Sequence, residues 1–398
     1  MHSALSRRSF TAALLTAVAL APIGSASAAT GVDRDDQDDW DDSLLDSVDP
    51  ELAARLDATI ADVCAQAAIP GAVVGLWLPG TGSYVRASGV ADTATGEPMT
   101  TDIRTRIGSE TKTFTATALL ELVDDGRIGL DDPICAYVDG VPGGDRITLR
   151  HLAEMRSGLF PYTADPDFAQ ALLSDPSRSF TPEQSLAYGF KHCNTSAPGE
   201  TFQYSNTNFV LLGLVIEKVS GVPLADFIRR RVLRPARLHR TLLPQGAGFP
   251  APHPHGYTNQ TLSGATADST DWNPSWAWAA GAMISDLHDL RRWAGVVATG
   301  PLLRPQTQRQ RLTTLPTGFP GTSYGLGILE TGGWIGHNGS IPGYESVTVH
   351  LPARKATLVT LINTDITHQG QEPSTLLARA VTAVATPDNV YAGAIPIT

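Results

Sequence analysis

The stretch Arg106-Ile-Gly-Ser-Glu-Thr-Lys-Thr-Phe-Thr-Ala116 places Ser109 three residues before Lys112. Side chains three residues apart on an α-helix lie one above the other on the same face. The Lys112 amine can therefore reach the Ser109 hydroxyl, which is the geometry of a serine nucleophile and the base that deprotonates it. The helix expected after Gly108 would also direct its N-terminal N–H groups toward an oxyanion developing at Ser109. Lys112 is one of four lysines in 398 residues, and none of the others has a serine at this spacing.

A second polar stretch, Phe202-Gln-Tyr-Ser-Asn-Thr-Asn-Phe209, contains Tyr204 and Asn206. A phenol beside a serine–lysine pair can pass a proton between the nucleophile and a leaving group, and an amide can orient a substrate carbonyl. The same residues also fit a polar loop followed by a helix, because Asn and Thr are good N-caps.

A third stretch, Trp334-Ile-Gly-His-Asn-Gly-Ser-Ile-Pro-Gly-Tyr344, places His337 between Gly336 and Gly339. Glycines allow a strand backbone to approach a ligand closely, which suits an edge strand whose N–H group completes an oxyanion hole. A glycine-rich hairpin is the alternative interpretation. We interpret His253-Pro-His255 as a surface turn, and no other His, Cys or carboxylate grouping has the spacing of metal ligands.

Strand-like runs at both ends of the chain enclose a helical middle. This order predicts an α/β (α+β) fold, in which one antiparallel sheet is assembled from both chain ends, flanked by helices and joined by an inserted, mostly helical lobe. The expected strands cover 72–78, 83–90, 324–328, 346–351 and 356–362, and the expected outer helices cover 50–68, 109–125, 280–294 and 373–385. The catalytic unit would span 51–390, with the α/β part at about 51–130 and 275–390 and the lobe at about 131–274.

The first 28 residues have the features of an export signal. Ser6-Arg-Arg-Ser-Phe10 is a twin-arginine start, an apolar run ends at Ile23, and Ala26-Ser-Ala28 is a small-residue cleavage site. The apolar run is too short to span a bilayer, so we expect a cleaved signal, no transmembrane anchor and a secreted protein. Residues 29–50 form an acidic run typical of a flexible leader. A net charge of −11 argues against nucleic acid as a partner.

The three cysteines, Cys64, Cys135 and Cys193, allow one disulfide at most. Their spacing matches no zinc or redox motif, and we expect them to be small, buried packing residues. The sequence leaves their pairing open.

Order and spacing connect the three polar motifs. S-x-x-K at Ser109, Y-x-N about 95 residues later and H-x-G about 130 residues after that follow one another as in the active-site serine β-lactamase and penicillin-binding family. The chain is most similar to the class C-like branch, in which H-x-G replaces K-T-G, and it resembles the secreted D-alanyl-D-alanine carboxypeptidases of actinomycetes. The resemblance covers roughly residues 50–385 and is strongest in the stretches 197–213, 255–257, 276–285 and 324–327.

The resemblance implies a role for each candidate residue. Ser109 would attack a carbonyl and become acylated, and either Lys112, as a neutral amine, or Tyr204 would remove its proton. The backbone N–H groups of Ser109 and Ser340 would form the oxyanion hole. No metal and no cofactor are implied. Of the remaining predicted site residues, His337 would support the Tyr204 side, and the substrate would contact Asn206, Trp276, Gly339 and Ser340.

The chain departs from these carboxypeptidases where they bind the terminal carboxylate of their substrate. They have an arginine after the Tyr-Gly-Leu-Gly-aliphatic turn, whereas this chain has Leu329-Glu330, and Ser340 and Pro342 replace their threonine and glutamine after H-x-G. Loss of a guanidinium that pairs bidentately with a carboxylate would cost roughly a few kcal/mol of recognition. Strict preference for a free C-terminal D-Ala is therefore in doubt.

We expect an exported serine acyl-enzyme hydrolase, either a D-Ala-D-Ala carboxypeptidase or a related D-stereospecific peptidase. Its substrates would be cell-wall stem peptides of peptidoglycan, and β-lactams would inhibit it. The alternative is an esterase, amidase or β-lactamase that uses the same Ser-Lys-Tyr site. A third hypothesis is a non-catalytic penicillin-binding receptor, which would be expected to carry a transmembrane segment and need not retain every proton-transfer group.

Overall fold

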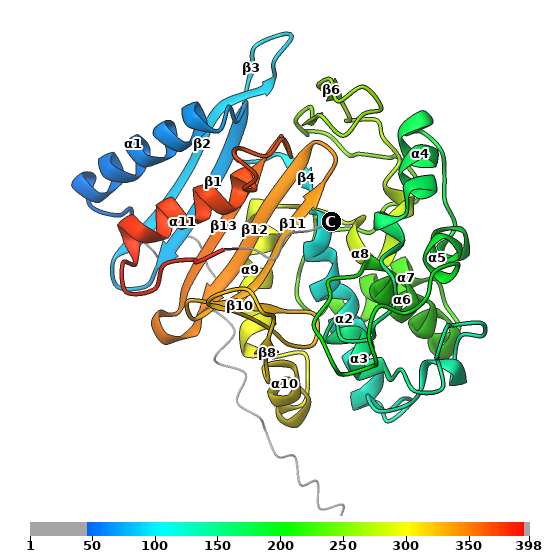
Figure 1. The fold of residues 1–398 in the computed structure, drawn as a ribbon. Coiled ribbons are helices and arrows are strands. Elements are labelled where there is room, and N and C mark those ends of the chain that lie inside the picture. Colours follow the sequence, from blue (N-terminus) through cyan, green and yellow to red (C-terminus); the bar gives the residue numbers. More distant parts are fainter. Residues whose placement is uncertain (1–45, 394–398) are drawn as a thin grey trace, which may run out of the picture. The chain divides into compact units, whose positions relative to one another are not determined.

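The computed structural model describes residues 46–393 (Figure 1). The predicted signal segment 1–28 and residues 29–45 of the predicted leader 29–50 lie outside the described residues. Within the described part of the chain, no helix is both long enough and apolar enough to cross a bilayer.

A nine-stranded antiparallel sheet lies at the centre of residues 46–393. Its N-terminal hairpin, β1 (Gly71–Leu78) and β2 (Gly82–Asp92), joins the C-terminal strand β13 (Ala356–Ile362) through pairing of β1 with β13. The expectation of one sheet assembled from both chain ends is therefore confirmed. The order across the sheet is β3 (Glu97–Pro98), β2, β1, β13, β12 (Tyr344–Leu351), β11 (Trp334–Ile341), β10 (Leu329–Thr331), β9 (Thr322–Tyr324) and β8 (Leu315–Pro316).

Helices cover both faces of this sheet, as its central strands require. Every residue of β1, β12 and β13 is buried, and strands that are buried on both faces need a layer of structure on each side. The helices α1 (Pro50–Gln66) and α11 (Pro373–Ala385) pack together, and α11 lies on β12 and β13 (Figure 1). The helix α9 (Leu287–Thr299) packs against the same strands from the other side.

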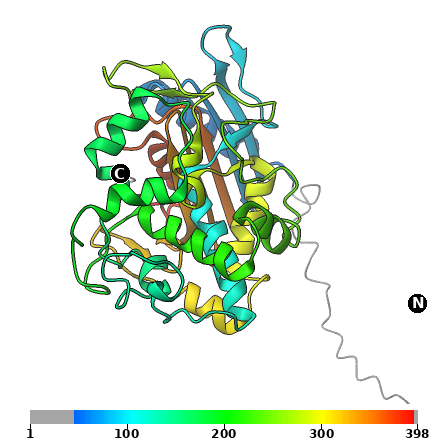
Figure 2. The ribbon, with the colours of Figure 1, turned by 90° about the vertical axis from the view of Figure 1, so that its right-hand side faces the viewer.

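The middle of the chain forms a group of helices next to β11, which Figure 2 shows in front of the sheet. Capping residues set several of their ends: Thr181 and Gln184 form a capping box, and Gly221 ends its helix in a left-handed conformation with φ of +76°. The helices are α2 (Thr111–Asp124), α3 (Leu149–Ala153), α4 (Pro166–Ser174), α5 (Pro182–Phe190), α6 (Asn206–Ser220), α7 (Leu224–Ile228), α8 (Trp278–Gly281) and α10 (Pro305–Arg311). Short strand pairs are β4 (Arg104–Arg106) with β7 (Ile284–Asp286), and β5 (Tyr257–Thr258) with β6 (Ala267–Asp268).

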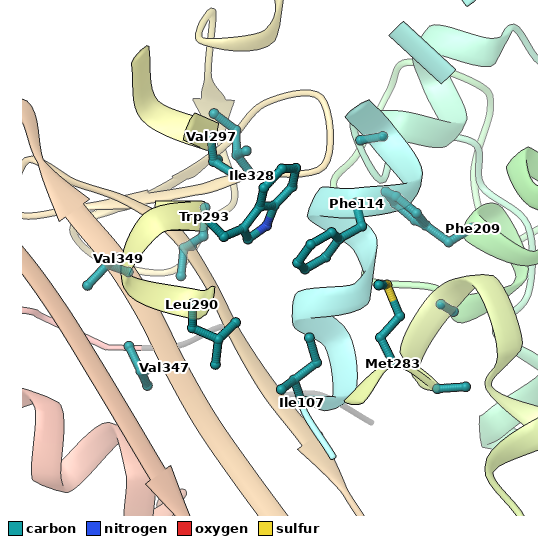
Figure 3. Close-up of a cluster of buried hydrophobic side chains, with 14 of the residues drawn as sticks. Ile107, Phe114, Phe209, Met283, Leu290, Trp293, Val297, Ile328, Val347 and Val349 are labelled. Atoms are coloured by element: carbon teal, nitrogen blue, oxygen red, sulfur yellow. The ribbon is translucent and has the colours of Figure 1, made fainter. Parts of the chain in front are cut away.

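Within this group, the helix α2 is buried between the sheet and the helices α6 and α8. The Phe114 ring stacks on the Trp293 ring of α9 with centroids 4.0 Å apart (Figure 3), and the Trp293 indole N–H donates to Thr113 Oγ1 at 2.7 Å. On its other side α2 contacts α6 and α8. Packing on both sides holds the first turn of α2, and with it the residues just before it, in a fixed position relative to the sheet.

The segment 280–294 differs from the prediction of one continuous helical run. α8 ends at Gly281, β7 follows, and α9 begins only at Leu287. In β7, Ile284 pairs with Arg106 of β4, the strand that leads into Ser109. The apolar pattern of this segment fits a helix locally, but pairing with a strand about 180 residues earlier overrides that preference.

The cysteines also differ from the prediction. All three are free, Cys64 is half-buried, and Cys135 and Cys193 are exposed. The prediction of buried packing residues is therefore wrong for Cys135 and Cys193. Cys135 lies in a 3₁₀ turn in which its neighbour Ile134 takes the buried position.

Candidate active site

Ser109 lies in a 3₁₀ turn, Gly108–Glu110, immediately before α2. Gly108 has φ of +49°, and a Cβ atom at this position would lie 2.6 Å from the backbone nitrogen of Ser340. Both features require glycine. The glycine before the nucleophile thus allows the turn to pack directly against β11, which brings the Ser109 and Ser340 backbones together.

The Lys112 amine contacts three oxygen atoms: Ser109 Oγ at 2.9 Å, Asn206 Oδ1 at 2.7 Å and the Ala280 carbonyl oxygen at 2.7 Å. Amide and peptide oxygens only accept hydrogen bonds, so Asn206 and Ala280 take two Nζ hydrogens. A neutral amine in this position directs its remaining lone pair at the Ser109 hydroxyl. Burial lowers the pKa of Lys112 well below its usual 10.5, which favours this neutral form.

Tyr204 packs over the same amine, with Lys112 Nζ 4.8 Å from the centre of its ring. Burial raises the pKa of Tyr204 well above 10, an effect that the nearby Ser109 hydroxyl only partly offsets. Among residues 46–393, no group satisfies the Tyr204 hydroxyl with a well-formed hydrogen bond. This hydroxyl is therefore a protonated donor next to the nucleophile, available to a leaving group.

His337 lies behind Tyr204, with the two ring centres 6.2 Å apart, and is 1% exposed. Its Nδ1 contacts the Asn338 carbonyl oxygen, which only accepts, so Nδ1 carries the proton and Nε2 accepts from the Tyr324 hydroxyl at 3.0 Å. Burial, together with the nearby Lys112, lowers the pKa of His337 to about 3. The structure thus places His337 as a neutral residue next to Tyr204 and outside the pocket lining.

Half of β11 is an open edge. β10 pairs with β11 only up to Gly336, and the Gly108–Glu110 turn packs against β11. His337, Asn338 and Gly339 all lie after Gly336, so the structure agrees with the prediction of an edge strand at H-x-G.

Strand pairing leaves the Ser340 N–H free on the open edge of β11. Ile341 and Tyr344 flank the two-residue turn that closes the β11–β12 hairpin. Hydrogen-bonded and non-hydrogen-bonded pairs alternate along antiparallel strands. Ser340, one residue before the closing pair, falls at a non-hydrogen-bonded position, so its N–H points away from β12. The Ser109 N–H, in the first turn of a helix, lacks an intrahelical acceptor. We therefore expect these two N–H groups to form the oxyanion hole.

Gly339 and Gly336 serve a different purpose from the predicted one. A Cβ at Gly339 would lie 1.9 Å from the Ile107 carbonyl oxygen, and a Cβ at Gly336 would lie 2.0 Å from the Thr348 carbonyl oxygen. Both glycines therefore allow close approach of protein backbone. Gly339 is also absent from the residues that line the pocket over Ser109, and its assignment as a substrate contact stays a prediction.

A pocket opens over Ser109, and Trp276, Asn206 and Ser340 line it together with the nucleophile. Asn206 Oδ1 accepts from Lys112, so its Nδ2 is the end of the amide left to donate to a substrate carbonyl. The lining contains no Asp, Glu, Lys, Arg or His. Its remaining members are mainly apolar: Thr163, Phe168, Ala169, Leu172, Leu173, Gln260, Ala277, Ala280, Gly281, Ile341 and Pro342.

The two residues that replace the expected arginine do not reach this pocket. Leu329 is buried in β10. The Glu330 carboxylate accepts from the Ser323 hydroxyl at 2.8 Å and from the Gly333 N–H at 3.0 Å. No other cation takes the missing position in the pocket lining of residues 46–393.

Sequence reasoning missed Ala280, Tyr324 and Gln260 as parts of the site. Ala280 and Tyr324 lie in stretches that carry the family resemblance, and this was the available signal. Ala280 acts through its backbone carbonyl oxygen, so its side chain gives no further indication. Gln260 carried no signal, because its contacts are long-range. His255, in the predicted surface turn, is half-buried, and its Nδ1 lies 2.6 Å from Asp268 Oδ2. Residues 46–393 contain no group of three or more His, Cys, Asp or Glu that could hold a metal.

Several known proteins are similar to this chain in sequence and in fold. A D-aminopeptidase from Brucella anthropi is 31% identical over 308 residues, which are 74% of this chain but only 56% of that longer protein. A D-stereospecific amidohydrolase from Streptomyces sp. is 33% identical, with a TM-score of 0.72 over 79% of this chain and 94% of that one. The D-amino acid amidase from Ochrobactrum anthropi SV3, solved with L-phenylalanine amide, is 30% identical, with a TM-score of 0.75 over 84% and 97%.

The family model described as Beta-lactamase matches residues 56–382. This span contains all the motif residues and every strand of the nine-stranded sheet. The chain therefore belongs to the beta-lactamase family and is a serine hydrolase with the β-lactamase/transpeptidase-like fold.

Proposed function

We propose that this protein is a D-stereospecific amidase or peptidase that works through an acyl-enzyme on Ser109. The observation that carries the proposal is a buried Ser109–Lys112 pair that opens into a pocket without a charged side chain in its lining. The substrate class is supported by the relatives, which are named as a D-aminopeptidase, a D-stereospecific amidohydrolase and a D-amino acid amidase.

In the proposed reaction, the neutral Lys112 amine takes the Ser109 proton while Oγ attacks the substrate carbonyl. The raised pKa keeps the Tyr204 hydroxyl protonated, so it cannot act as the base, and we assign this first step to Lys112. The oxyanion forms between the N–H groups of Ser109 and Ser340. The Lys112 proton then passes through the Tyr204 hydroxyl to the leaving nitrogen as the C–N bond breaks. Water then attacks the acyl-enzyme and gives a proton through the Tyr204 hydroxyl to Lys112. Lys112 returns this proton to Ser109 Oγ as the acyl bond breaks, which restores the hydroxyl and the neutral amine.

The neutral lining argues for leaving groups that carry no charge. A substrate with a free C-terminal carboxylate would lose solvation in this pocket without gaining a cationic partner. D-Ala-D-Ala carboxypeptidase activity should therefore be weaker than hydrolysis of the matching C-terminal amide. Cell-wall stem peptides remain candidate natural substrates when the cleaved bond lies away from a free carboxylate, and secretion by the predicted signal is part of this proposal.

Labelling by a fluorescent penicillin tests the nucleophile. The protein should be labelled, and Ser109→Ala should abolish labelling because no acyl bond can form. Ser88→Ala, a matched change in β2 on the N-terminal hairpin, should label like the unchanged protein. Labelling that persists in Ser109→Ala would exclude the proposed acyl-enzyme.

A substrate panel tests the specificity. Rates are compared on D- and L-phenylalanine amide, on an acyl-D-Ala-D-Ala peptide, on its C-terminal amide, and on a simple ester. We expect the D-amide to exceed the L-amide, and the C-terminal amide to exceed the free acid by roughly 10- to 100-fold, the cost of an unpaired polar group. Faster cleavage of the free acid would establish a carboxypeptidase instead, and turnover of the ester alone would establish an esterase.

A further inference from the structure

The loop that follows β5 brings one long polar side chain, Gln260, to the pocket. Thr258 anchors the start of this loop: its hydroxyl accepts from the Gln260 N–H at 3.1 Å and donates to Asp365 at 3.0 Å. Gln260 is itself exposed at the pocket mouth, so its side chain can meet a substrate without a rearrangement of the core.

Asp365 is the acceptor that holds this arrangement together. It is 5% exposed, and its Oδ2 accepts both from the Thr258 hydroxyl and from Gln260 Nε2. Its Oδ1 accepts from the Gly343 N–H at 3.0 Å. Three donors around one buried carboxyl suit its ionised form, which has only acceptor sites.

This contact decides which end of the Gln260 amide faces the pocket. Because a carboxylate only accepts, the NH₂ end of Gln260 must face Asp365, and Oε1 is left to accept from a ligand. Asn206 is oriented the opposite way, since its Oδ1 accepts from Lys112 and its Nδ2 is left to donate. The uncharged pocket therefore offers one amide donor and one amide acceptor on two different elements.

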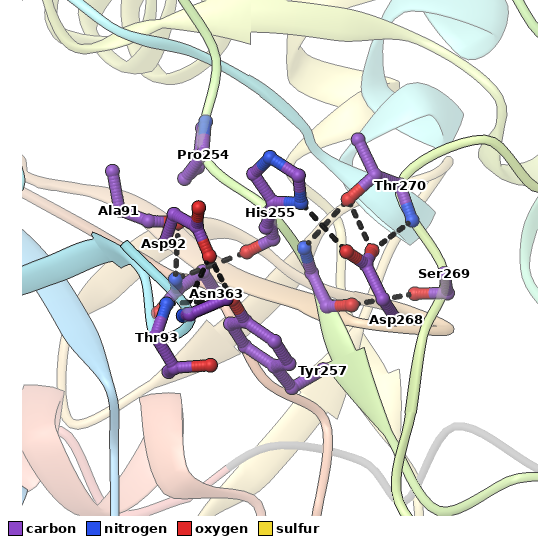
Figure 4. Close-up of polar contacts among 12 residues, drawn as sticks. Ala91, Asp92, Thr93, Pro254, His255, Tyr257, Asp268, Ser269, Thr270 and Asn363 are labelled. Atoms are coloured by element: carbon purple, nitrogen blue, oxygen red, sulfur yellow. Dashed lines mark hydrogen bonds and ion pairs between the residues drawn. The ribbon is translucent and has the colours of Figure 1, made fainter. Parts of the chain in front are cut away.

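Asp365 also holds the hairpin that carries Ser340. In addition to the Gly343 N–H bond, the Ser269 hydroxyl donates to the Pro342 carbonyl oxygen at 2.8 Å. A Cβ at Gly343 would lie 2.1 Å from Ser269 Oγ, so the loop and the hairpin tip are in direct contact. Figure 4 shows the neighbouring anchor of this loop, where Asn363 Nδ2 donates to the His255 carbonyl oxygen at 3.0 Å.

We propose that Gln260 is a specificity-determining residue whose Oε1 accepts an N–H carried by the acyl part of the substrate, and that Asp365 is the positioning residue that orients it. The inference rests on the proposed function and narrows it. The favoured acyl group carries an amino or acylamino N–H on its stereocentre, while Asn206 holds a carbonyl. The Asp365 carboxylate then holds both the Gln260 amide that recognises this N–H and the hairpin that bears the Ser340 N–H.

A pair of substrates isolates this contact. D-phenylalanine amide carries the N–H, and 3-phenylpropanamide is the same amide without the amino group. The measured quantity is the ratio of their kcat/KM values. In Gln260→Leu, which keeps the side-chain size but removes the acceptor, this ratio should fall roughly tenfold, the usual worth of one hydrogen bond to a charged group or slightly less. Gln66→Leu, the same change on the exposed end of α1, should leave the ratio unchanged.

Asp365→Asn tests the positioning role. An Asn at this position can donate to Gln260 Oε1, which would turn the Gln260 amide around and present its NH₂ end to the pocket. The ratio should then fall although Gln260 is intact. A merely structural role would lower kcat on both substrates together and leave their ratio as it was, and that result would overturn the role of Asp365.

The outcomes separate this inference from the proposed function. A ratio that is unchanged in Gln260→Leu, in a protein that still hydrolyses D-phenylalanine amide, overturns the inference and leaves the function intact. Failure of the unchanged protein to hydrolyse either amide, or to be acylated at Ser109, overturns the function itself. Thermal unfolding of each variant confirms that the comparison is made on folded protein.

Discussion

Gly339→Ala should disrupt the oxyanion hole through one added methyl group. The new Cβ would lie 1.9 Å from the Ile107 carbonyl oxygen, whereas a carbon and a carbonyl oxygen normally approach to about 3.3 Å. The two segments must therefore separate by roughly 1.4 Å, the difference between these distances. Ile107 cannot easily yield, because its N–H donates to the Met283 carbonyl oxygen at 3.0 Å and its own carbonyl oxygen accepts from the Glu110 N–H at 3.2 Å.

The separation moves the two expected oxyanion donors apart, since Ser109 lies two residues after Ile107 and Ser340 directly follows Gly339. A displacement of about 1 Å in an active site can cost about 100-fold in rate, and loss of one oxyanion-hole donor costs about 10²–10³-fold in kcat. We therefore expect kcat on an amide substrate to fall about 100-fold. Overpacking should also lower the free energy of unfolding by about 1–3 kcal/mol.

The assay measures kcat per folded enzyme, with the folded fraction taken from near-ultraviolet circular dichroism and stability from urea unfolding. Gly71→Ala is the matched control, because its Cβ would lie 2.3 Å from the Val90 carbonyl oxygen in β2, away from the pocket lining. The control should lose stability and keep its kcat. A folded Gly339→Ala protein with normal kcat would refute the assignment of the Ser340 N–H to the oxyanion hole.

Three further results should follow from the buried pair and its neighbours. First, kcat/KM on an uncharged amide should rise once with pH, as Lys112 loses its proton below pH 10.5, fall only well above pH 10 as Tyr204 ionises, and show no step from His337, whose pKa is about 3; a second step near pH 6.5, in addition to the rise from Lys112, would contradict this. Second, Tyr204→Phe should reduce amide turnover about 10²-fold or more but affect a nitrophenyl ester much less, since that leaving group needs no proton; equal losses in parallel assays would argue against proton delivery by Tyr204. Third, the unfolded chain keeps the Lys112 proton up to about pH 10.4 while the folded protein releases it earlier, so stability should rise with pH in this window; urea unfolding of Lys112→Met should lack that slope, and an unchanged slope would place the titration elsewhere.

Local patterns were sufficient to predict much of the fold. The hairpin of β1 and β2, the hairpin of β12 and β13, and the helix α11 (Pro373–Ala385) all follow from apolar periodicity and turn residues. The segment around Ile284 could not be predicted in the same way. Its strand conformation depends on pairing with Arg106, and a contact between distant segments leaves no trace in a local pattern.

In the candidate site, too, local spacing could be interpreted from sequence and contacts between distant segments could not. Ser109 and Lys112 could be paired from spacing alone, because three residues on a helix define a geometry. The two glycines of β11 could be recognised as important but not explained, since a glycine that admits a ligand and one that admits a neighbouring carbonyl look identical in sequence. The orientation of the Gln260 amide depends on its hydrogen bond to Asp365, a residue more than 100 positions away in the sequence.

The sequence by itself therefore determined the chemistry: a serine, a lysine and a tyrosine in an order typical of acyl-enzyme hydrolases. Only the tertiary structure decided how that chemistry is directed. Folding buries Lys112 among acceptors that leave its lone pair to Ser109, places His337 behind Tyr204, and surrounds the nucleophile with a lining that carries no charge. The physical reason is that the state of a proton and the fit of a substrate depend on burial and on neighbours from distant segments, and both come into existence only when the chain folds.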